Sequence, residues 1–426
     1  MEPLLLILLA VVMSVVFLLI LLLYDWDIMA PAPLITGTMA FSCIIALTQI
    51  HNWMLSMSFK GFFGLLVGIL SFCIASAWCS RQMQQRIVIE KLPSLNTRKY
   101  FFVFSLILMA CLAFFSVREI YRLSIMLGNE QGIFYTLKVV RPAIEAQKVQ
   151  LSRWMSYRMM IAQTITYVYV YIFINQTLSR GFCWKNIFYL LPCVLYIPFM
   201  ITTTGRMAMI TLIIYFIVTA MLLYHKVKGY SGETNRKVIL VLLLSGILFF
   251  TFFLAMGNFT GKVVSGTRTP MVILAHYAGL SVPAFGTVIE QPVLDSGYIG
   301  SNTLLGIYRI LSRIGFHLPT VDIFLPFVQF SGIDTNVYTA EWRYIWDYGF
   351  TGMVAVMAIL GVGYTFSYEY IKNRKVSPLI IMFYGVMAYP LFLSSIDERF
   401  MLDLLGTAAL YNFCFLYIVY RLAIKK

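Results

Sequence analysis

The chain has 426 residues, of which 60% are hydrophobic and only 12% are charged. Soluble domains carry about 25% charged residues, so this composition excludes a soluble globular protein and favours one that crosses a membrane many times. The net charge is +14, but its placement matters more than its total, and we expect no nucleic-acid partner.

Apolar runs of about 20 residues recur along the chain, and such a run crosses a bilayer as a helix. The first run, Pro3 to Leu23, lacks a basic n-region and a small-residue cleavage site, which favours a retained helix over a signal peptide. We predict an all-α polytopic membrane protein, a single integral membrane domain over residues 1–426 with about eleven transmembrane helices (ten to twelve). The predicted helices lie near 3–23, 30–49, 61–79, 100–117, 159–178, 186–204, 207–224, 238–256, 350–370, 378–395 and 401–420.

Several catalytic signatures are absent from the sequence. None of the seven cysteines forms a pair with zinc-ligand spacing, and no HExxH motif, DxD motif or glycine-rich phosphate loop occurs. We therefore expect no metal, no cofactor and no nucleotide-sugar substrate. The interiors of the predicted helices hold almost no charge, which argues against an ion-coupled pump.

Lysine and arginine in the short loops predict the orientation of the chain. The loops 80–99, 179–185, 225–237 and 371–377, with the tail 421–426, fall on one side and hold 17 of the 32 basic residues. We predict that this side, with the C-terminus, is cytoplasmic.

The opposite, outer side holds the other basic residues, which are mostly arginine. A guanidinium binds phosphate through two parallel hydrogen bonds, whereas lysine acts as a point charge. Because positive charge is disfavoured on this side, the arginines as a set predict an anionic ligand, although any one of them can instead pair with an outer acid or a lipid headgroup. They are Arg118, Arg122, Arg141, Arg153, Arg158, Arg206, Arg268, Arg309, Arg313, Arg343 and Arg399.

Two predicted outer segments are long. The first covers 116–158 and carries Arg118 and Arg122, whose i,i+4 spacing places them on one helical face as candidate substrate ligands. The second is the large loop 257–349, between the predicted helices near 238–256 and 350–370.

The large loop holds further candidates. Arg268 is a possible substrate ligand of the same kind. An amphipathic helix is predicted near 302–316, where Arg309 and Arg313 share one face and an apolar stripe suits the membrane surface.

Arg206 is the strongest single candidate for a catalytic anion ligand. It follows Gly205 at the outer end of one predicted helix and opens the next, where free amides and the helix dipole attract anions. We predict that it acts in catalysis by holding a phosphate; the alternative is an arginine that snorkels to the interface.

Polar residues gather between Asp334 and Gly352, just before a predicted membrane helix. Arg343 is a candidate second anion ligand, with a cation–π or ion-pair role as the alternative.

Glu341 and Asp347 are candidate general bases, since removal of a hydroxyl proton needs a carboxylate or an imidazole within reach. Asp334, His276 and His317 are alternative bases, and the alternative role of each acid is a structural ion pair.

Other residues near this stretch are candidate substrate contacts. The side chains of Asn336, Tyr338 and Thr339 suit hydrogen bonds to sugar hydroxyls, and His276 is a weaker candidate. The aromatic residues are equally well explained as an interfacial belt.

Two motifs resemble the oligosaccharide repeat-unit polymerases, the O-antigen polymerase family of bacterial polysaccharide export. They are Thr335-Asn336-x-Tyr338-Thr339 followed by Asp347-Tyr348-Gly349-x-x-Gly352, and the Gly205-Arg206 pair between two helices. The plan of many helices with one large, late outer loop is similar too.

The resemblance implies a fold like that of the membrane C-type glycosyltransferases, in a bacterial plasma (inner) membrane with the active site facing the periplasm or the cell exterior. It implies that polyprenyl-diphosphate-linked oligosaccharides are both donor and acceptor, with a chain-length regulator protein as a further partner. The growing glycan would pass from its lipid to the non-reducing end of a new lipid-linked unit, with inversion and without a metal.

Two other functions stay open at this point. An O-antigen ligase-like enzyme would use the same donor but a different acceptor. A flippase or exporter of lipid-linked oligosaccharide would be no enzyme, but it should show two related halves or charges along a central path, and the sequence shows neither.

Overall fold

The chain folds almost entirely into helices, as the computed structural model shows for residues 3–83, 87–146, 148–202, 207–259, 269–291, 298–318 and 325–425. This confirms the all-α class. The first half of the chain holds α1 (Pro3–Leu23), α2 (Pro31–Leu47), α3 (Phe59–Gln82), α4 (Lys99–Met126), η1 (Ile133–Tyr135), α5 (Thr136–Glu145), α6 (Arg153–Arg180), α7 (Trp184–Ile187), η2 (Phe188–Leu190), α8 (Leu191–Thr202) and α9 (Met207–Lys228).

The second half begins with a long helix, continues through short elements in the predicted large loop, and returns to long helices. Its elements are α10 (Gly232–Phe259), α11 (Pro270–Leu274), the π-helix η3 (Ala275–Gly279), α12 (Ser281–Val288), α13 (Leu305–Arg313), β1 (Val328–Phe330), β2 (Ile333–Thr335), α14 (Glu341–Asn373), α15 (Pro378–Met387), α16 (Tyr389–Leu393), α17 (Phe400–Leu404) and α18 (Thr407–Ala423).

The apolar side chains form two large cores. One lies among α1, α2, α3, α12 and α14 up to Tyr364. The other lies among α6, α8, α9, α15, α18 and α14 from Tyr368 onwards. Tyr24 and Phe392 pack against both, so the two cores adjoin. Helix α14 therefore joins the two halves of the bundle.

Helices α3 and α14 pack closely because small residues lie between them. Ser76 of α3 donates a hydrogen bond to the carbonyl oxygen of Gly361 at 3.2 Å. A Cβ at Gly361 would lie 2.5 Å from the carbonyl oxygen of Phe72, so only glycine permits this approach.

Fewer of the described helices than the predicted eleven are long and apolar enough to cross a membrane. Within the described residues, six helices are long and apolar enough to cross a membrane, or seven if the bent pair Met271–Gly279 and Ser281–Val288 forms one span. The predicted eleven is therefore not confirmed, although each predicted range overlaps a helix. Several of these helices are shorter than a span, such as α2, or are broken, as α15 and α16 are at Ala388.

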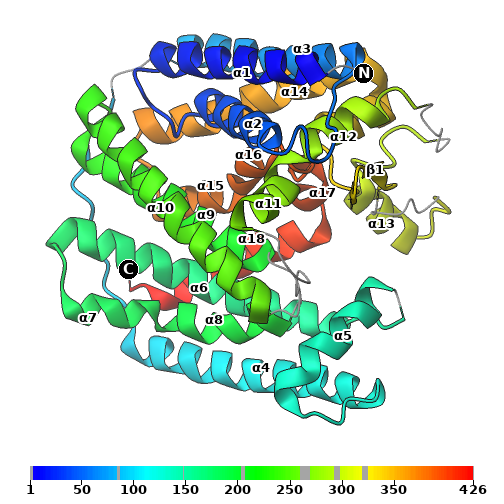
Figure 1. The fold of residues 1–426 in the computed structure, drawn as a ribbon. Coiled ribbons are helices and arrows are strands. Elements are labelled where there is room, and N and C mark those ends of the chain that lie inside the picture. The colour runs from blue at the N-terminus through cyan, green and yellow to red at the C-terminus, as the bar shows by residue number, and fades with distance from the viewer. Residues whose placement is uncertain are drawn as a thin grey trace.

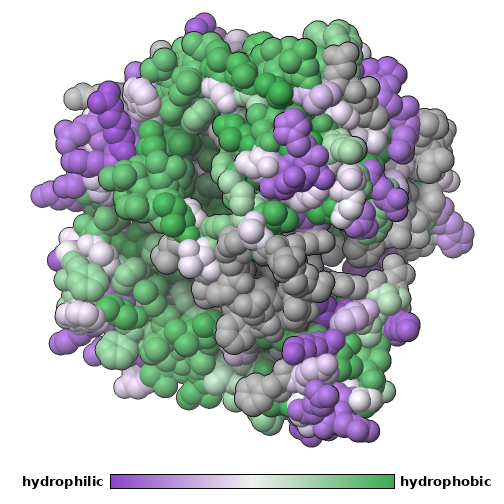
Figure 2. Space-filling view, viewed as in Figure 1, coloured by the Kyte–Doolittle hydropathy of each residue, from purple (hydrophilic) through white to green (hydrophobic). Residues whose placement is uncertain are grey.

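The surface is nevertheless that of a membrane protein. Large apolar side chains on α1 are exposed, among them Leu4, Val11 and Leu19 at 54–66%. On the face shown in Figure 2, hydrophobic residues cover much of the middle, and hydrophilic residues gather towards the two ends. Exposed apolar area of this extent needs lipid to cover it.

Elements from both predicted outer segments lie at one end of the bundle, whereas α11 of the second segment lies near the middle. Figure 1 shows α5, α13 and β1 at this end, on the right, whereas α7 and the C-terminus lie towards the opposite end. We call the end that holds α13 the α13 end, and the end that holds α7 and the C-terminus the C-terminal end.

A backbone break at Gly349 separates the predicted polar stretch from the membrane helix that follows. Gly349 has φ 69° and ψ −177° within α14, a conformation that residues with a Cβ rarely adopt. Residues 341–348 thus form a separate first part of α14. Before them, β1 and β2 form an antiparallel hairpin that turns at Gly332, which the all-helical prediction did not include.

Candidate functional site

A cavity of about 490 Å³ lies where α13 meets the first turns of α9 and α18, a size typical of ligand sites. Gly306 and Gly406 let α13 approach closely, since a Cβ at Gly306 would lie 2.7 Å from the Cα of Gly406. We call this the arginine cavity. It is lined by Met159, Gln163, Tyr167, Met207, Ala208, Thr211, Leu305, Gly306, Arg309, Arg313, Val386, Tyr389, Arg399, Leu402, Asp403, Leu404, Gly406, Thr407, Ala408, Ala409, Asn412 and Phe413.

One wall of the cavity carries positive charge. Arg309 and Arg313 lie one turn apart on α13, which confirms the predicted amphipathic helix with both arginines on one face. Both are exposed, and neither forms an ion pair with a described residue. Arg399 adds a third guanidinium from the loop before α17.

The N-terminus of α18 faces the same space. Gly406, Thr407, Ala408 and Ala409 all line the cavity, and Gly406 makes no side-chain capping bond to the helix. The first amides of a helix attract anions when no side chain caps them. This positive helix end therefore adds to the three guanidinium groups.

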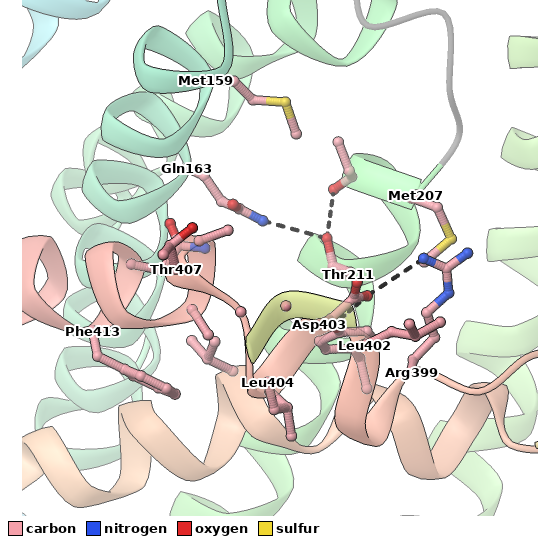
Figure 3. A pocket seen from close by; sticks show the side chains of 18 of the residues that line it. Met159, Gln163, Met207, Thr211, Arg399, Leu402, Asp403, Leu404, Thr407 and Phe413 are labelled. Carbon is pink, nitrogen blue, oxygen red and sulfur yellow. Dashed lines mark hydrogen bonds and ion pairs between the residues drawn. The ribbon is translucent and has the colours of Figure 1, made fainter. Parts of the chain in front are cut away.

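Arg399 is held by two carboxylates. Its Nη2 lies 2.7 Å from Oδ2 of Asp397, and its Nη1 lies 3.5 Å from Oδ2 of Asp403 (Figure 3). The hydroxyl of Tyr389 donates to the same Asp403 oxygen at 2.7 Å. These bonds fix the guanidinium at the edge of the cavity.

The opposite wall is polar but uncharged. Gln163 of α6 donates to the hydroxyl of Tyr167 at 2.8 Å and lies 3.5 Å from the hydroxyl of Thr211 on α9. Figure 3 shows Gln163 and Arg399 on opposite sides of the view, with Thr211 drawn between them. Oδ1 of Asn412 and Nε of Arg399 are buried without a hydrogen-bond partner among the described residues. The cavity thus offers both cationic and neutral hydrogen-bonding groups.

Arg343, predicted as an anion ligand, is connected to the cavity but does not line it. Its side chain is 4% exposed, and its Nε lies 3.9 Å from Oδ1 of Asp397, the residue that holds Arg399. A chain of charges therefore runs from the predicted polar stretch to the cavity wall.

Glu398 fixes the loop between α16 and α17 that carries Asp397 and Arg399. It accepts hydrogen bonds from the hydroxyl of Tyr344 at 2.9 Å and from the amides of Met401 at 2.7 Å and Leu402 at 3.1 Å. Burial raises the pKa of the Glu398 carboxyl to about 7. The loop is thus tied to the first part of α14.

Asp347, a predicted general base, is saturated by a neighbouring turn. Its carboxylate accepts the amide and Nδ2 of Asn302 at 3.1 and 3.0 Å, and the amide and hydroxyl of Thr303 at 2.7 Å each. Donors therefore occupy both oxygens of this carboxylate. The geometry gives Asp347 the task of holding the turn before α13.

Glu341, the other predicted base, lies away from the arginine cavity. It is fully buried, and its side chain packs against Gly68 of α3 and Met353 of α14. Its two carboxylate oxygens accept no hydrogen bond from the described residues. Glu341 therefore does not share the cavity with Arg309, Arg313 and Arg399.

The predicted sugar contacts lie near the hairpin instead of the cavity. Tyr338 is buried and donates to the carbonyl oxygen of Pro326, Thr339 is buried, and Asn336 is half-buried. His276 lies 3.4 Å from the carbonyl oxygen of Asp334. None of these residues lines the arginine cavity.

Four arginines that the sequence analysis singled out as individual site residues are still to be placed. Arg118 and Arg122 are exposed on α4 and do not line the cavity. Arg206 and Arg268 lie outside the described residues. Met207, which follows Arg206 directly in the chain, lines the cavity.

The sequence pattern pointed to none of Gln163, Asn412 and Asp403 as a site residue. The i,i+4 spacing of Arg399 and Asp403 at the start of a predicted membrane helix is the signal that would have found the pair.

No protein-family model, no curated protein and no solved structure matches this chain. The resemblance to the O-antigen polymerases therefore rests on the sequence alone.

Proposed function

We propose that this chain is a membrane glycosyltransferase that polymerises lipid-linked oligosaccharide repeat units. The observation that supports it is the arginine cavity, in which Arg309, Arg313 and Arg399 face an uncharged polar wall. Guanidinium groups suit a diphosphate, whereas amides and hydroxyls suit a sugar. A glycan joined to polyprenyl diphosphate carries both groups side by side.

In the proposed reaction the growing glycan leaves its polyprenyl diphosphate and joins the non-reducing end of a new lipid-linked unit. The bond between the anomeric carbon and a diphosphate oxygen breaks, and negative charge develops on the departing oxygen. Positive groups fixed before the reaction stabilise that charge without having to reorganise. Attack from the opposite face of the sugar inverts the anomeric carbon.

We place the cavity on the side of a bacterial plasma membrane that faces the periplasm or the cell exterior. The loops at the C-terminal end hold 17 of the 32 lysines and arginines, which favours that end as cytoplasmic. The arginine cavity lies next to α13, at the opposite end of the bundle.

The test is polymerisation by the purified full-length chain in nanodiscs. The substrate is the host's own lipid-linked repeat unit, extracted from a strain that lacks this chain. We expect a ladder of longer lipid-linked glycans, formed equally well with a chelator. A flippase would give no ladder, and a ligase would consume the donor only when a lipid A core or protein acceptor is added.

A double variant connects this activity to the cavity. Arg309→Ala with Arg313→Ala removes two of the three guanidinium groups and should raise the KM for the lipid-linked unit. The matched control is Arg236→Ala, since Arg236 is exposed in α10 and lies over the ring of Trp26, outside the cavity. A double variant with the kinetics of the control would contradict the proposed site.

A further inference from the structure

The described lining of the arginine cavity includes one carboxylate, that of Asp403, and no histidine. Asp403 lies in the short helix α17, which follows Arg399 directly, and its side chain is 36% exposed. The carboxylates predicted as bases from the sequence, Glu341 and Asp347, do not line the cavity. Among the described residues, the carboxylate that can take a proton in this cavity is therefore that of Asp403 on α17.

The contacts of Asp403 leave one oxygen open. Tyr389 donates to Oδ2 at 2.7 Å, and Nη1 of Arg399 lies 3.5 Å from that same oxygen. Oδ1 has no hydrogen bond or ion pair with a described residue. The carboxylate is thus fixed in orientation through one oxygen while the other is available. Asp347 differs in this respect, since donors occupy both of its oxygens.

Unpartnered polar atoms on neighbouring residues indicate that a polar ligand belongs here. Nε of Arg399 and Oδ1 of Asn412 are buried and unpartnered within the described part of the chain. A buried polar atom without a partner is energetically unfavourable, so such atoms in a cavity are expected to meet a ligand or water. Asn412 Oδ1 is an acceptor that suits a sugar hydroxyl.

We infer that Asp403 is the general base of the transfer, an assignment that rests on the proposed function. The acceptor hydroxyl oxygen bonds to the anomeric carbon of the donor glycan while its proton passes to Oδ1 of Asp403. The bond from that carbon to the diphosphate oxygen breaks, and the diphosphate departs with the electron pair towards the arginines. Asp403 then releases the proton to water.

The position of Arg399 gives the pair two separate tasks. The guanidinium stabilises the departing diphosphate, whereas the carboxylate 3.5 Å away receives the proton. Loss of the base should therefore spare a reaction whose nucleophile has no proton to lose. Azide is such a nucleophile, because it attacks the anomeric carbon as an anion and yields a glycosyl azide.

The test compares polymer and glycosyl azide formed by the full-length chain in nanodiscs from the host's lipid-linked repeat unit. Asp403→Asn keeps the side-chain shape but cannot take a proton, so polymer formation should fall by about 10²- to 10⁴-fold. Glycosyl azide formation by the same variant should stay at the wild-type rate. Asp403→Glu, which restores a carboxylate, should recover part of the polymer formation.

Asp397→Asn is the matched control, since Asp397 contacts the same arginine but does not line the cavity. It acts through Arg399 and should lower polymer and glycosyl azide in the same ratio. If Asp403→Asn also lowers both products in one ratio, or forms polymer at the wild-type rate, the assignment of Asp403 as base is wrong. Failure of the proposed function itself is distinct, because the wild-type chain would then form neither product.

Discussion

Arg343 and Arg399 lie on either side of one carboxylate, that of Asp397. Nε of Arg343 is 3.9 Å from Oδ1, and Nη2 of Arg399 is 2.7 Å from Oδ2. Arg343 belongs to the first part of α14, whereas Arg399 lines the arginine cavity. Asp397 therefore couples the polar stretch that the sequence emphasises to a site that the sequence does not reveal.

Arg399→Ala should lower the turnover of repeat-unit polymerisation by about 10²- to 10³-fold, the typical effect of removing one donor that stabilises a developing negative charge. Arg399→Lys should recover only part of the rate, because an ammonium cannot contact Asp397 and Asp403 through one fixed fork. The measurement is polymer formed per amount of folded protein in nanodiscs. Arg236→Ala serves as the arginine control, and equal rates in the two alanine variants would exclude Arg399 from the reaction.

Asp347→Asn should lower stability and not the chemical step. The amide presents a donor group to a turn that offers only donors to this position, so we expect a loss of about 1–3 kcal/mol in the free energy of unfolding. Thr303→Val removes one partner of the same carboxylate and should also lower the thermal midpoint. A variant with an unchanged midpoint and no turnover would instead support the original assignment of Asp347 as a base.

The sequence predicted the helices well and the site only in part, for physical reasons. A long apolar run in the sequence directly predicts a helix that crosses the lipid. The predicted ranges of α1, α3 and α9 therefore differ from the observed ones only by a few residues at their ends. Arg309 and Arg313 were placed on one face because their spacing is local. Which arginines meet in space depends on contacts far apart in the chain, such as Gly306 with Gly406.

The roles of the acids were harder still to predict. Asp347 looks like a free carboxylate until Asn302 and Thr303, about 45 residues earlier in the chain, are seen to saturate it. Asp403 looks like an isolated charge at a helix end until the fold brings α13 and α9 to the same cavity. The hydrogen-bond partners of a carboxylate, and the meeting of distant helices at one cavity, cannot be recognised from the residues next to it in the sequence.

Stability should depend on pH through Glu398. Burial raises its pKa from 4.5 to about 7, so the folded chain binds this proton more tightly than the unfolded chain does. The stabilisation is complete below about pH 4.5 and is lost as the pH rises through about 7. We expect the thermal midpoint to fall across this window and the fall to be smaller in Glu398→Gln. The control is Glu290→Gln, since Glu290 is an exposed ion-pair partner of Lys60. In this variant the thermal midpoint should depend on pH as it does in the wild type. If the pH dependence is also unchanged in Glu398→Gln, another group is responsible for it.

Two glycines of α14, two residues apart, allow a matched test of the helix packing that joins the two halves of the bundle. A Cβ at Gly361 would meet the Phe72 carbonyl oxygen at 2.5 Å, whereas a Cβ at Gly363 would meet nothing within 4 Å. Gly361→Ala must push α3 and α14 apart and should lower the free energy of unfolding by about 1–3 kcal/mol. Gly363→Ala replaces glycine by a better helix former in open space, so it should leave stability unchanged or raise it by up to about 1 kcal/mol. The measurement is thermal unfolding of both variants in the same detergent. Because both substitutions are chemically identical and lie in one helix, equal midpoints would mean that α3 and α14 do not approach as closely as this structure places them.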